Sequence, residues 1–132
     1  MKQYDDAIKV YEIGRKYYND TNNCAVVAVA IVCRVAYGKA FNTLKRLGRV
    51  TGRGTPITLT VPALNQLGFQ SEHIEFNKCT VSTITRQLDK NSMYLVRVRG
   101  HILAVRNGDV IDWSKGRRHR VLQVLKVTKL GE

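Results

Sequence analysis

The architecture of this chain follows from one stretch, Thr21-Asn22-Asn23-Cys24, which continues as Ala25-Val26-Val27-Ala28-Val29-Ala30-Ile31-Val32-Cys33. Polar residues that cap helices precede nine residues without a charge. The pattern predicts a helix that begins at Cys24, is buried on most sides and continues to about Tyr37, with Gly38 as its stop. The unpaired N–H groups of a helix start favour negative charge, which makes a thiol there easier to ionise. Cys24 is therefore either a reactive thiol or a small core residue.

Length and composition predict one domain over residues 1–132, with a single core, because 44% of the 132 residues are hydrophobic. There is no basic-then-apolar leader, and the longest apolar run is shorter than the ~20 residues that span a bilayer. We therefore expect no membrane span and a cytoplasmic location, in a bacterium or an infected host cell. Three cysteines, Cys24, Cys33 and Cys79, lack paired spacing, which favours a reducing compartment over disulfides or zinc. We expect no metal and no cofactor.

Positive charge dominates the composition. The 22 Lys and Arg residues against 10 Asp and Glu give a net charge of +12. Such an excess favours a polyanionic partner, which is nucleic acid, anionic lipid or wall polymer, or an acidic protein. The densest basic segment supplies the candidate polyanion-binding residues, which are Lys115, Arg117, Arg118 and Arg120.

The first two thirds of the chain read mainly as helices. Residues 4–18 suit either a short helix or an extended lead-in. Further helices are predicted over residues 39–47, 61–67 with Thr60 as cap and Pro62 in the first turn, and 80–89. The basic loop 49–58 is either a solvated connector or a phosphate or substrate contact. A strand is predicted over 69–76, with His73 at the surface.

The last third changes to runs rich in β-branched residues. These runs cover residues 93–98, 101–106, 109–113 and 120–127, and turn residues separate them. They predict an antiparallel meander. The fold class is therefore α+β, with an N-terminal helical half followed by a C-terminal sheet.

Asn107-Gly108 predicts a two-residue hairpin turn, which pairs Arg106 with Asp109. Alternation along the two strands then places on one face His101, Leu103, Val105, Val110, Asp112 and Ser114. Asp112 is a diagonal neighbour of His101 on that face, whereas Asp109 points to the other. A carboxylate beside an imidazole favours its protonated form, which holds a nearby thiol as thiolate. One alternative is that His101 and Asp112 form a solvated pair. The other is that this face is packed, because its other residues are apolar; Cys24 at the start of a buried helix would then explain why a histidine and an aspartate lie on it.

Two motifs resemble those of papain-like cysteine peptidases, most closely the bacteriocin-processing peptidases and small phage- and plasmid-encoded relatives. They are Asn23-Cys24-Ala25-Val26 and the hairpin from Gly100-His101 through Asn107-Gly108 to Asp112-Trp113. The resemblance implies a papain-like fold in which the buried helix carrying Cys24 packs on the C-terminal antiparallel sheet. It also implies that Cys24 is the nucleophile, His101 the general base and acid, and Asp112 the orienting carboxylate.

The resemblance extends to the oxyanion site and to function. The backbone N–H of Cys24 would supply one donor; the family's glutamine, six residues before the cysteine, is Tyr18 here, and Asn19 is the candidate substitute. The implied activity is that of a cysteine hydrolase or acyl-transfer enzyme, foremost a phage- or mobile-element-encoded peptidase acting on a peptide or protein through a thioester. The alternatives are an inert scaffold that binds nucleic acid or a host protein, and a cell-wall amidase.

Overall fold

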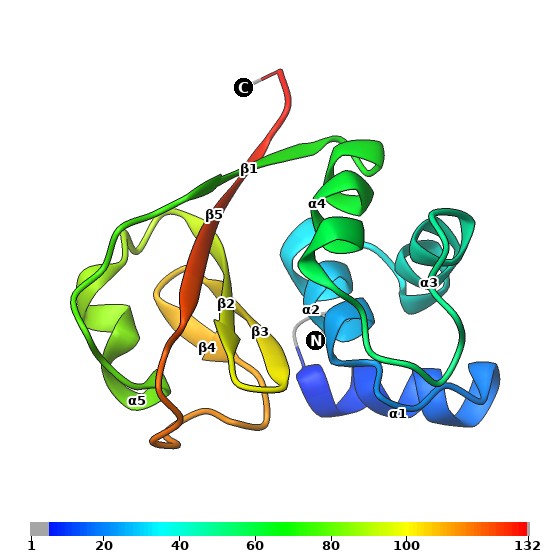
Figure 1. The fold of residues 1–132 in the computed structure, drawn as a ribbon, viewed down its shortest axis with the longest axis horizontal. Helices are drawn as coiled ribbons and strands as arrows, with labels where there is room; N and C mark the ends of the chain where they lie inside the picture. Colours follow the sequence, from blue (N-terminus) through cyan, green and yellow to red (C-terminus); the bar gives the residue numbers. More distant parts are fainter. Residues whose placement is uncertain (1–5, 132) are drawn as a thin grey trace.

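The chain folds into a helical half followed by a sheet, in a computed structural model that describes residues 6–131 (Figure 1). The elements in chain order are α1 (Ala7–Tyr18), α2 (Cys24–Cys33), α3 (Tyr37–Arg46), α4 (Ile57–Gln66), β1 (Phe69–His73), α5 (Val81–Ile84), the 3₁₀ turn η2 (Thr85–Gln87), β2 (Met93–Val98), β3 (His101–Arg106), β4 (Asp109–Ile111) and β5 (Gln123–Lys129). The α+β class is confirmed. Residues 1–5, which include the start of the predicted segment 4–18, lie outside the described residues.

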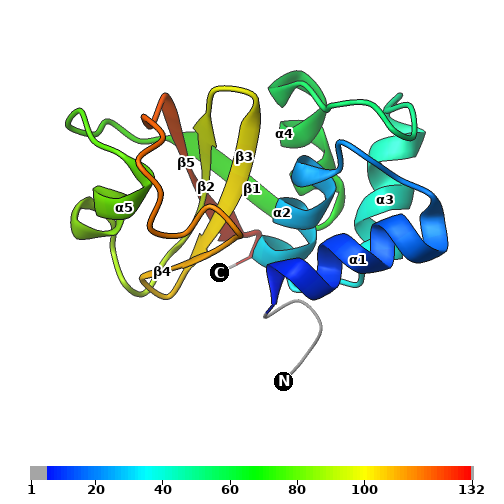
Figure 2. The same ribbon diagram turned by 90° about the horizontal axis from the view of Figure 1, so that it is seen from below.

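Helices cover the sheet on both faces (Figure 2). Helix α2 packs on one face, against Leu95, Ile102 and Ala104, and is itself enclosed by α1, α3 and α4. Helix α5 packs on the other face, against Leu103 and Val105. The predicted single core is therefore divided into two apolar clusters, because the sheet lies between them.

Helix α2 is buried as predicted, but it is shorter. Every residue from Ala25 to Cys33 is buried, because no side chain in this range is polar enough to require solvent. The helix ends at Cys33 rather than near Tyr37, since Arg34 adopts a left-handed conformation with φ of 55° and its N–H bonds back to the carbonyls of the last turn. Gly38 is not a stop but lies inside α3, where a Cβ atom would come within 2.2 Å of the Tyr18 hydroxyl.

Helix α4 begins at Ile57, earlier than the predicted start, after the extended residue Pro56. Thr60 is thus a buried helical residue and not the cap; its hydroxyl donates to the Pro56 carbonyl at 3.3 Å. Pro62 consequently lies inside the helix instead of in its first turn. Strand β1 is also shorter than predicted, and His73 is exposed, as expected.

The sheet departs from a simple meander. Its strand order is β1-β5-β2-β3-β4, with antiparallel neighbours throughout. Strands β2, β3 and β4 follow one another as predicted, but β5 returns to pair with β2. After β4, Arg120 forms an isolated bridge with Thr80 beside α5. Strand β5 starts at Gln123, later than predicted, and pairs with the edge of β2 that β3 leaves open.

The β3–β4 hairpin has the predicted register. Arg106 pairs with Asp109 and Val105 with Val110. Asn107 and Gly108 both have positive φ, 55° and 77°, which is the conformation that a two-residue turn of this type requires. The register fixes which side chains of this hairpin face α2 and which face α5.

Within the described residues, no single helix has the length and hydropathy of a membrane span. Helices α2 and α3 reach these values only as a pair, and the pair is bent by 118°.

Candidate functional site

Three chain segments bring Cys24, His101 and Asp112 together. Cys24 is the first residue of α2, His101 the first residue of β3, and Asp112 follows β4 directly. The packed face of the hairpin was expected to adjoin the Cys24 helix, but α5 covers it, and α2 lies on the opposite face. His101 nevertheless lies next to Cys24, because the first residue of β3 is beside the start of α2.

Asp112 holds the His101 ring. Oδ2 of Asp112 lies 2.8 Å from Nε2 of His101, and the two side chains are 3% and 17% exposed. The same oxygen accepts hydrogen bonds from the backbone N–H of Ser114, at 2.9 Å, and from the Ser114 hydroxyl. Since Nε2 is engaged by Asp112, Nδ1 is the ring nitrogen that remains for an interaction with Cys24.

The electrostatics of the pair favour a thiolate beside an imidazolium. Burial opposes ionisation of Cys24, but hydrogen bonds from His101 and from the backbone N–H of Ile102 and Ala25 hold the pKa of the thiol below its ordinary value. Burial likewise opposes protonation of His101, but the hydrogen bonds with Asp112 and Cys24 outweigh it and raise the pKa of the ring to about 9. Both shifts favour the ion-paired form of the two side chains, which holds a nucleophilic sulfur and an acid.

The chemistry of the site has to be read from this geometry. No protein-family model, curated protein or solved structure matches the chain. A thiolate at a helix start, an imidazolium beside it and a carboxylate behind the ring are together able to carry out nucleophilic attack and proton transfer.

Two clefts meet at the Cys24–His101 pair. One, of about 510 Å³, is walled by α1 and Trp113; the other, of about 540 Å³, is walled by residues 54–57 and Ile102. Both include Cys24, Gly100 and His101 in their walls. An extended substrate therefore has space on both sides of the sulfur.

Trp113 covers one side of the histidine ring. Its ring centroid lies 5.0 Å from that of His101 and 5.3 Å from that of Tyr11, which α1 supplies. Trp113 is 40% exposed and follows the end of β4 rather than continuing the strand as predicted. It thus joins α1 to the hairpin at the mouth of the first cleft.

The structure does not support Asn19 as an oxyanion donor. Asn19 is exposed, ends α1 in a left-handed conformation and lines neither cleft at Cys24. The Tyr18 ring packs against Tyr37 and Phe41 instead of facing the site.

Two other amides line the first cleft, but both are engaged elsewhere. Nδ2 of Asn22 donates to the Gly52 carbonyl at 3.0 Å, and Nδ2 of Asn23 donates to the Tyr37 hydroxyl at 3.2 Å. The first backbone bond of α2 runs from Val27 N–H to Asn23, so the N–H of Cys24 has no acceptor within the helix. This N–H is the donor best placed to stabilise the negative charge that develops on a carbonyl oxygen.

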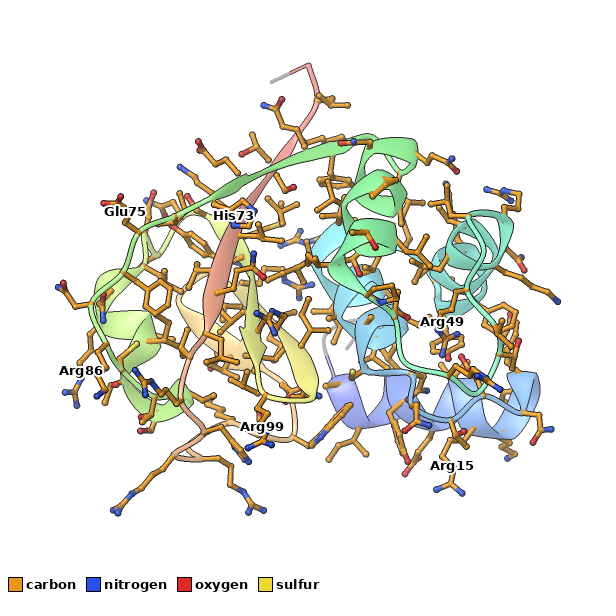
Figure 3. All side chains as sticks on the ribbon, in the orientation of Figure 1. Arg15, Arg49, His73, Glu75, Arg86 and Arg99 are labelled. Carbon is orange, nitrogen blue, oxygen red and sulfur yellow. The ribbon has the colours of Figure 1, made fainter. Side chains whose placement is uncertain are left out.

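A buried ion pair that sequence reasoning missed holds the segment before Cys24. Asp20 is fully buried, and Arg49 contacts both of its oxygens, at 2.9 and 3.0 Å. The Gly52 N–H and the Tyr37 hydroxyl also donate to this carboxylate. Figure 3 shows Arg49 within the helical half of the molecule. Arg49 is therefore neither a solvated connector nor a substrate contact, whereas Gly54 to Ile57 of the same loop do line the second cleft.

The approach of α1 to this network depends on Gly14. A Cβ atom there would lie 2.3 Å from Cζ of Tyr37 and 2.7 Å from Nδ2 of Asn23. The only sign of the buried ion pair in the sequence is Asp20, the single charged residue in the polar cluster 19–23.

The predicted polyanion-binding residues do not form one group. Lys115 pairs with Asp109, Arg117 lines a third cleft beside His101, and Arg118 and Arg120 are exposed outside the walls of that cleft. In residues 6–131 no three His, Cys, Asp or Glu side chains are grouped so that they could hold a metal ion.

Proposed function

We propose that this protein is a papain-like cysteine hydrolase, foremost a peptidase, with Cys24 as nucleophile, His101 as acid and base, and Asp112 as the orienting carboxylate. The observation that carries the proposal is the position of the His101 ring, between Asp112 Oδ2 at 2.8 Å and the thiol at the start of α2. A buried helix that carries the thiol and packs on an antiparallel sheet supports the papain-like arrangement.

Acylation begins from the ion pair. The Cys24 thiolate attacks the carbonyl carbon of the scissile amide, and the carbonyl oxygen takes up negative charge beside the N–H of Cys24. As the C–N bond breaks, the His101 imidazolium gives its proton to the leaving nitrogen. The products are a thioester on Cys24, neutral His101 and a free amine.

Deacylation restores the ion pair. Neutral His101 takes a proton from water, whose oxygen attacks the thioester carbonyl, and the C–S bond breaks. The acid leaves, and Cys24 returns to thiolate beside protonated His101. If an amine replaces water, the same steps transfer the acyl group, which is why hydrolysis and acyl transfer belong to one proposal.

The proposal is tested by trapping the thioester. The protein is incubated with a mixture of fluorescence-quenched peptides, and the acylated residue is found by mass spectrometry after acid quench. We expect the added mass on Cys24, loss of turnover in Cys24→Ala, and normal turnover in the control Cys79→Ala. Undiminished turnover in Cys24→Ala would contradict the proposal.

The excess of positive charge favours a second candidate, a scaffold that binds nucleic acid or an acidic protein without catalysis. The cationic side chains Arg117, Arg118 and Arg120 are all exposed. Titration with a labelled oligonucleotide at several salt concentrations tests this function, which predicts a steep salt dependence that Cys24→Ala leaves unchanged.

A further inference from the structure

A third cleft, of about 380 Å³, has His101 in its wall but not Cys24. It shares His101 and Trp113 with the first cleft, and its remaining walls include Arg99, Arg117 and His119. Arg99 extends from the turn between β2 and β3 (Figure 3), whereas Arg117 and His119 belong to the segment between β4 and β5. The two arginines thus come from separate segments and converge next to the proposed reaction centre.

The walls of this cleft are held by backbone hydrogen bonds. The N–H of Ser82 donates to the Arg117 carbonyl at 3.0 Å, and the N–H of Val81 donates to the His119 carbonyl at 3.0 Å. The N–H of Arg117 in turn donates to the Ser114 carbonyl at 2.9 Å, and Ser114 is the residue that binds Asp112. The segment is therefore tied both to α5 and to the proposed triad.

The charge of the cleft is not neutralised from within. No Asp or Glu side chain forms part of its walls. In the described part of the chain, neither Arg99 nor Arg117 lies within ion-pair distance of a carboxylate, in contrast to Arg49 with Asp20 and Lys115 with Asp109. Guanidinium groups bind carboxylates in a planar, two-point geometry, so this pair of arginines is suited to an anionic side chain.

We propose that this cleft binds an Asp or Glu side chain of the substrate, so that the substrates are acidic peptides; the inference rests on the proposed peptidase function. A peptide is favoured over a nucleic acid because the cleft adjoins His101, where a bound carboxylate would lie close to the scissile bond. A phosphate backbone would use the exposed arginines of the segment equally, including Arg118, which lies outside the cleft.

The test measures binding separately from turnover, in the Cys24→Ala protein. Fluorescence anisotropy is recorded with a labelled Glu-rich peptide mixture, the same mixture with Gln in place of Glu, and a single-stranded oligonucleotide. Arg99→Gln and Arg117→Gln are each introduced, and Arg118→Gln is the control, because it removes the same charge from the same segment outside the cleft.

We expect tighter binding of the Glu mixture than of the Gln mixture, and about tenfold weaker binding of the Glu mixture in Arg99→Gln and in Arg117→Gln, which is the effect of one lost charge-assisted hydrogen bond. Arg118→Gln should change this binding by less than about twofold. Equal losses in all three variants, or no difference between Glu and Gln, would overturn the inference in favour of unspecific polyanion binding.

Turnover separates the two proposals. If the wild-type protein cleaves Glu and Gln peptides with equal kcat/KM, the acidic subsite is wrong and the peptidase stands. If no peptide is cleaved while the cleft arginines still govern Glu-selective binding, the subsite stands and the peptidase is wrong.

Discussion

The guanidinium of Arg106 donates a hydrogen bond to the backbone carbonyl of Ile31 at 2.8 Å. Arg106 is the last residue of β3 and Ile31 lies in the last turn of α2, whereas the first residues of the same two elements are His101 and Cys24. Helix and strand are therefore joined at both ends. The Arg106 contact thus ties the far ends of the two elements whose first residues are the thiol and the imidazole.

Replacing Arg106 by Met should lower the free energy of unfolding by about 2 kcal/mol, since a buried hydrogen bond from a charged donor is lost. Urea unfolding measures this effect, and Arg97→Met is the control, because Arg97 is exposed and contacts only the Gln123 side chain among the side-chain bonds described. Alkylation of Cys24 should also slow in Arg106→Met, as the helix start loses its position. Equal stability of the two variants would show that the Ile31 contact is unimportant.

Iodoacetamide should label Cys24 first at neutral pH. The pKa of Cys24 is lowered, whereas burial raises the pKa of Cys33 to about 12 and also raises that of Cys79. Because the thiolate is the species that reacts, peptide mapping after short exposure should find the label on Cys24. His101→Ala should remove this preference, and similar rates at all three thiols would contradict the ion pair.

Activity should have an alkaline limit near pH 9. The rate requires Cys24 deprotonated and His101 protonated, so kcat/KM rises as pH passes the lowered pKa of the thiol and falls as pH passes the His101 pKa of about 9. Asp112→Asn removes the carboxylate that raises the His101 pKa. Its alkaline limit should move to lower pH by about one pH unit or more. An unchanged alkaline limit in this variant would mean that Asp112 does not raise the pKa of His101.

Ser114→Ala should reduce kcat with little effect on KM. Ser114 acts through Asp112, because its hydroxyl donates to Oδ2, the same oxygen that binds the His101 ring. Loss of a hydrogen bond to a charged acceptor costs about 1.5 to 3 kcal/mol. If this whole cost appears as poorer orientation of the His101 ring, kcat should fall about tenfold or more. Because the Asp112 carboxylate and its charge remain, the alkaline limit of Ser114→Ala should stay close to that of the wild type, in contrast to Asp112→Asn.

Asp20→Asn should destabilise the fold by about 3 to 5 kcal/mol, because it leaves the Arg49 charge buried without its partner. Burial opposes ionisation of Asp20, but the hydrogen bonds from Arg49, Tyr37 and Gly52 outweigh it and hold the pKa of the carboxyl below its usual range. Its stabilising contribution is therefore complete above the ordinary carboxyl pKa of about 4 and is lost as pH falls through the lower folded value. Thermal unfolding should show this acid dependence in the wild type and a weaker one in Asp20→Asn.

Local pattern was sufficient for several elements. The apolar run after Asn23 predicted a buried helix, and Asn107-Gly108 predicted a turn whose register matches the structure. Both signals are local: the chemistry of a few adjacent residues sets the backbone geometry, and alternation then sets the faces. The pairing of His101 with Asp112 followed from that register alone.

Other features depend on contacts between distant segments. The order of strands placed β5 beside β2 rather than β4, and the ion pair joined Asp20 to Arg49 across separate loops. Side chains that meet only after the chain has folded leave no spacing in the sequence by which to recognise them. For the same reason Asn19 was misplaced, since distance along the chain does not say on which side of α2 a residue lies.

By itself, the sequence determined the start of the Cys24 helix, the hairpin turn and the side chains that share each hairpin face, because these depend on local backbone preferences and on the alternation of a strand. Only the tertiary structure decided that α5 and α2 take opposite faces of the sheet, and that His101 nevertheless meets Cys24 at the start of β3. Packing of two apolar surfaces on one sheet, together with the Arg106–Ile31 bond, makes that meeting possible.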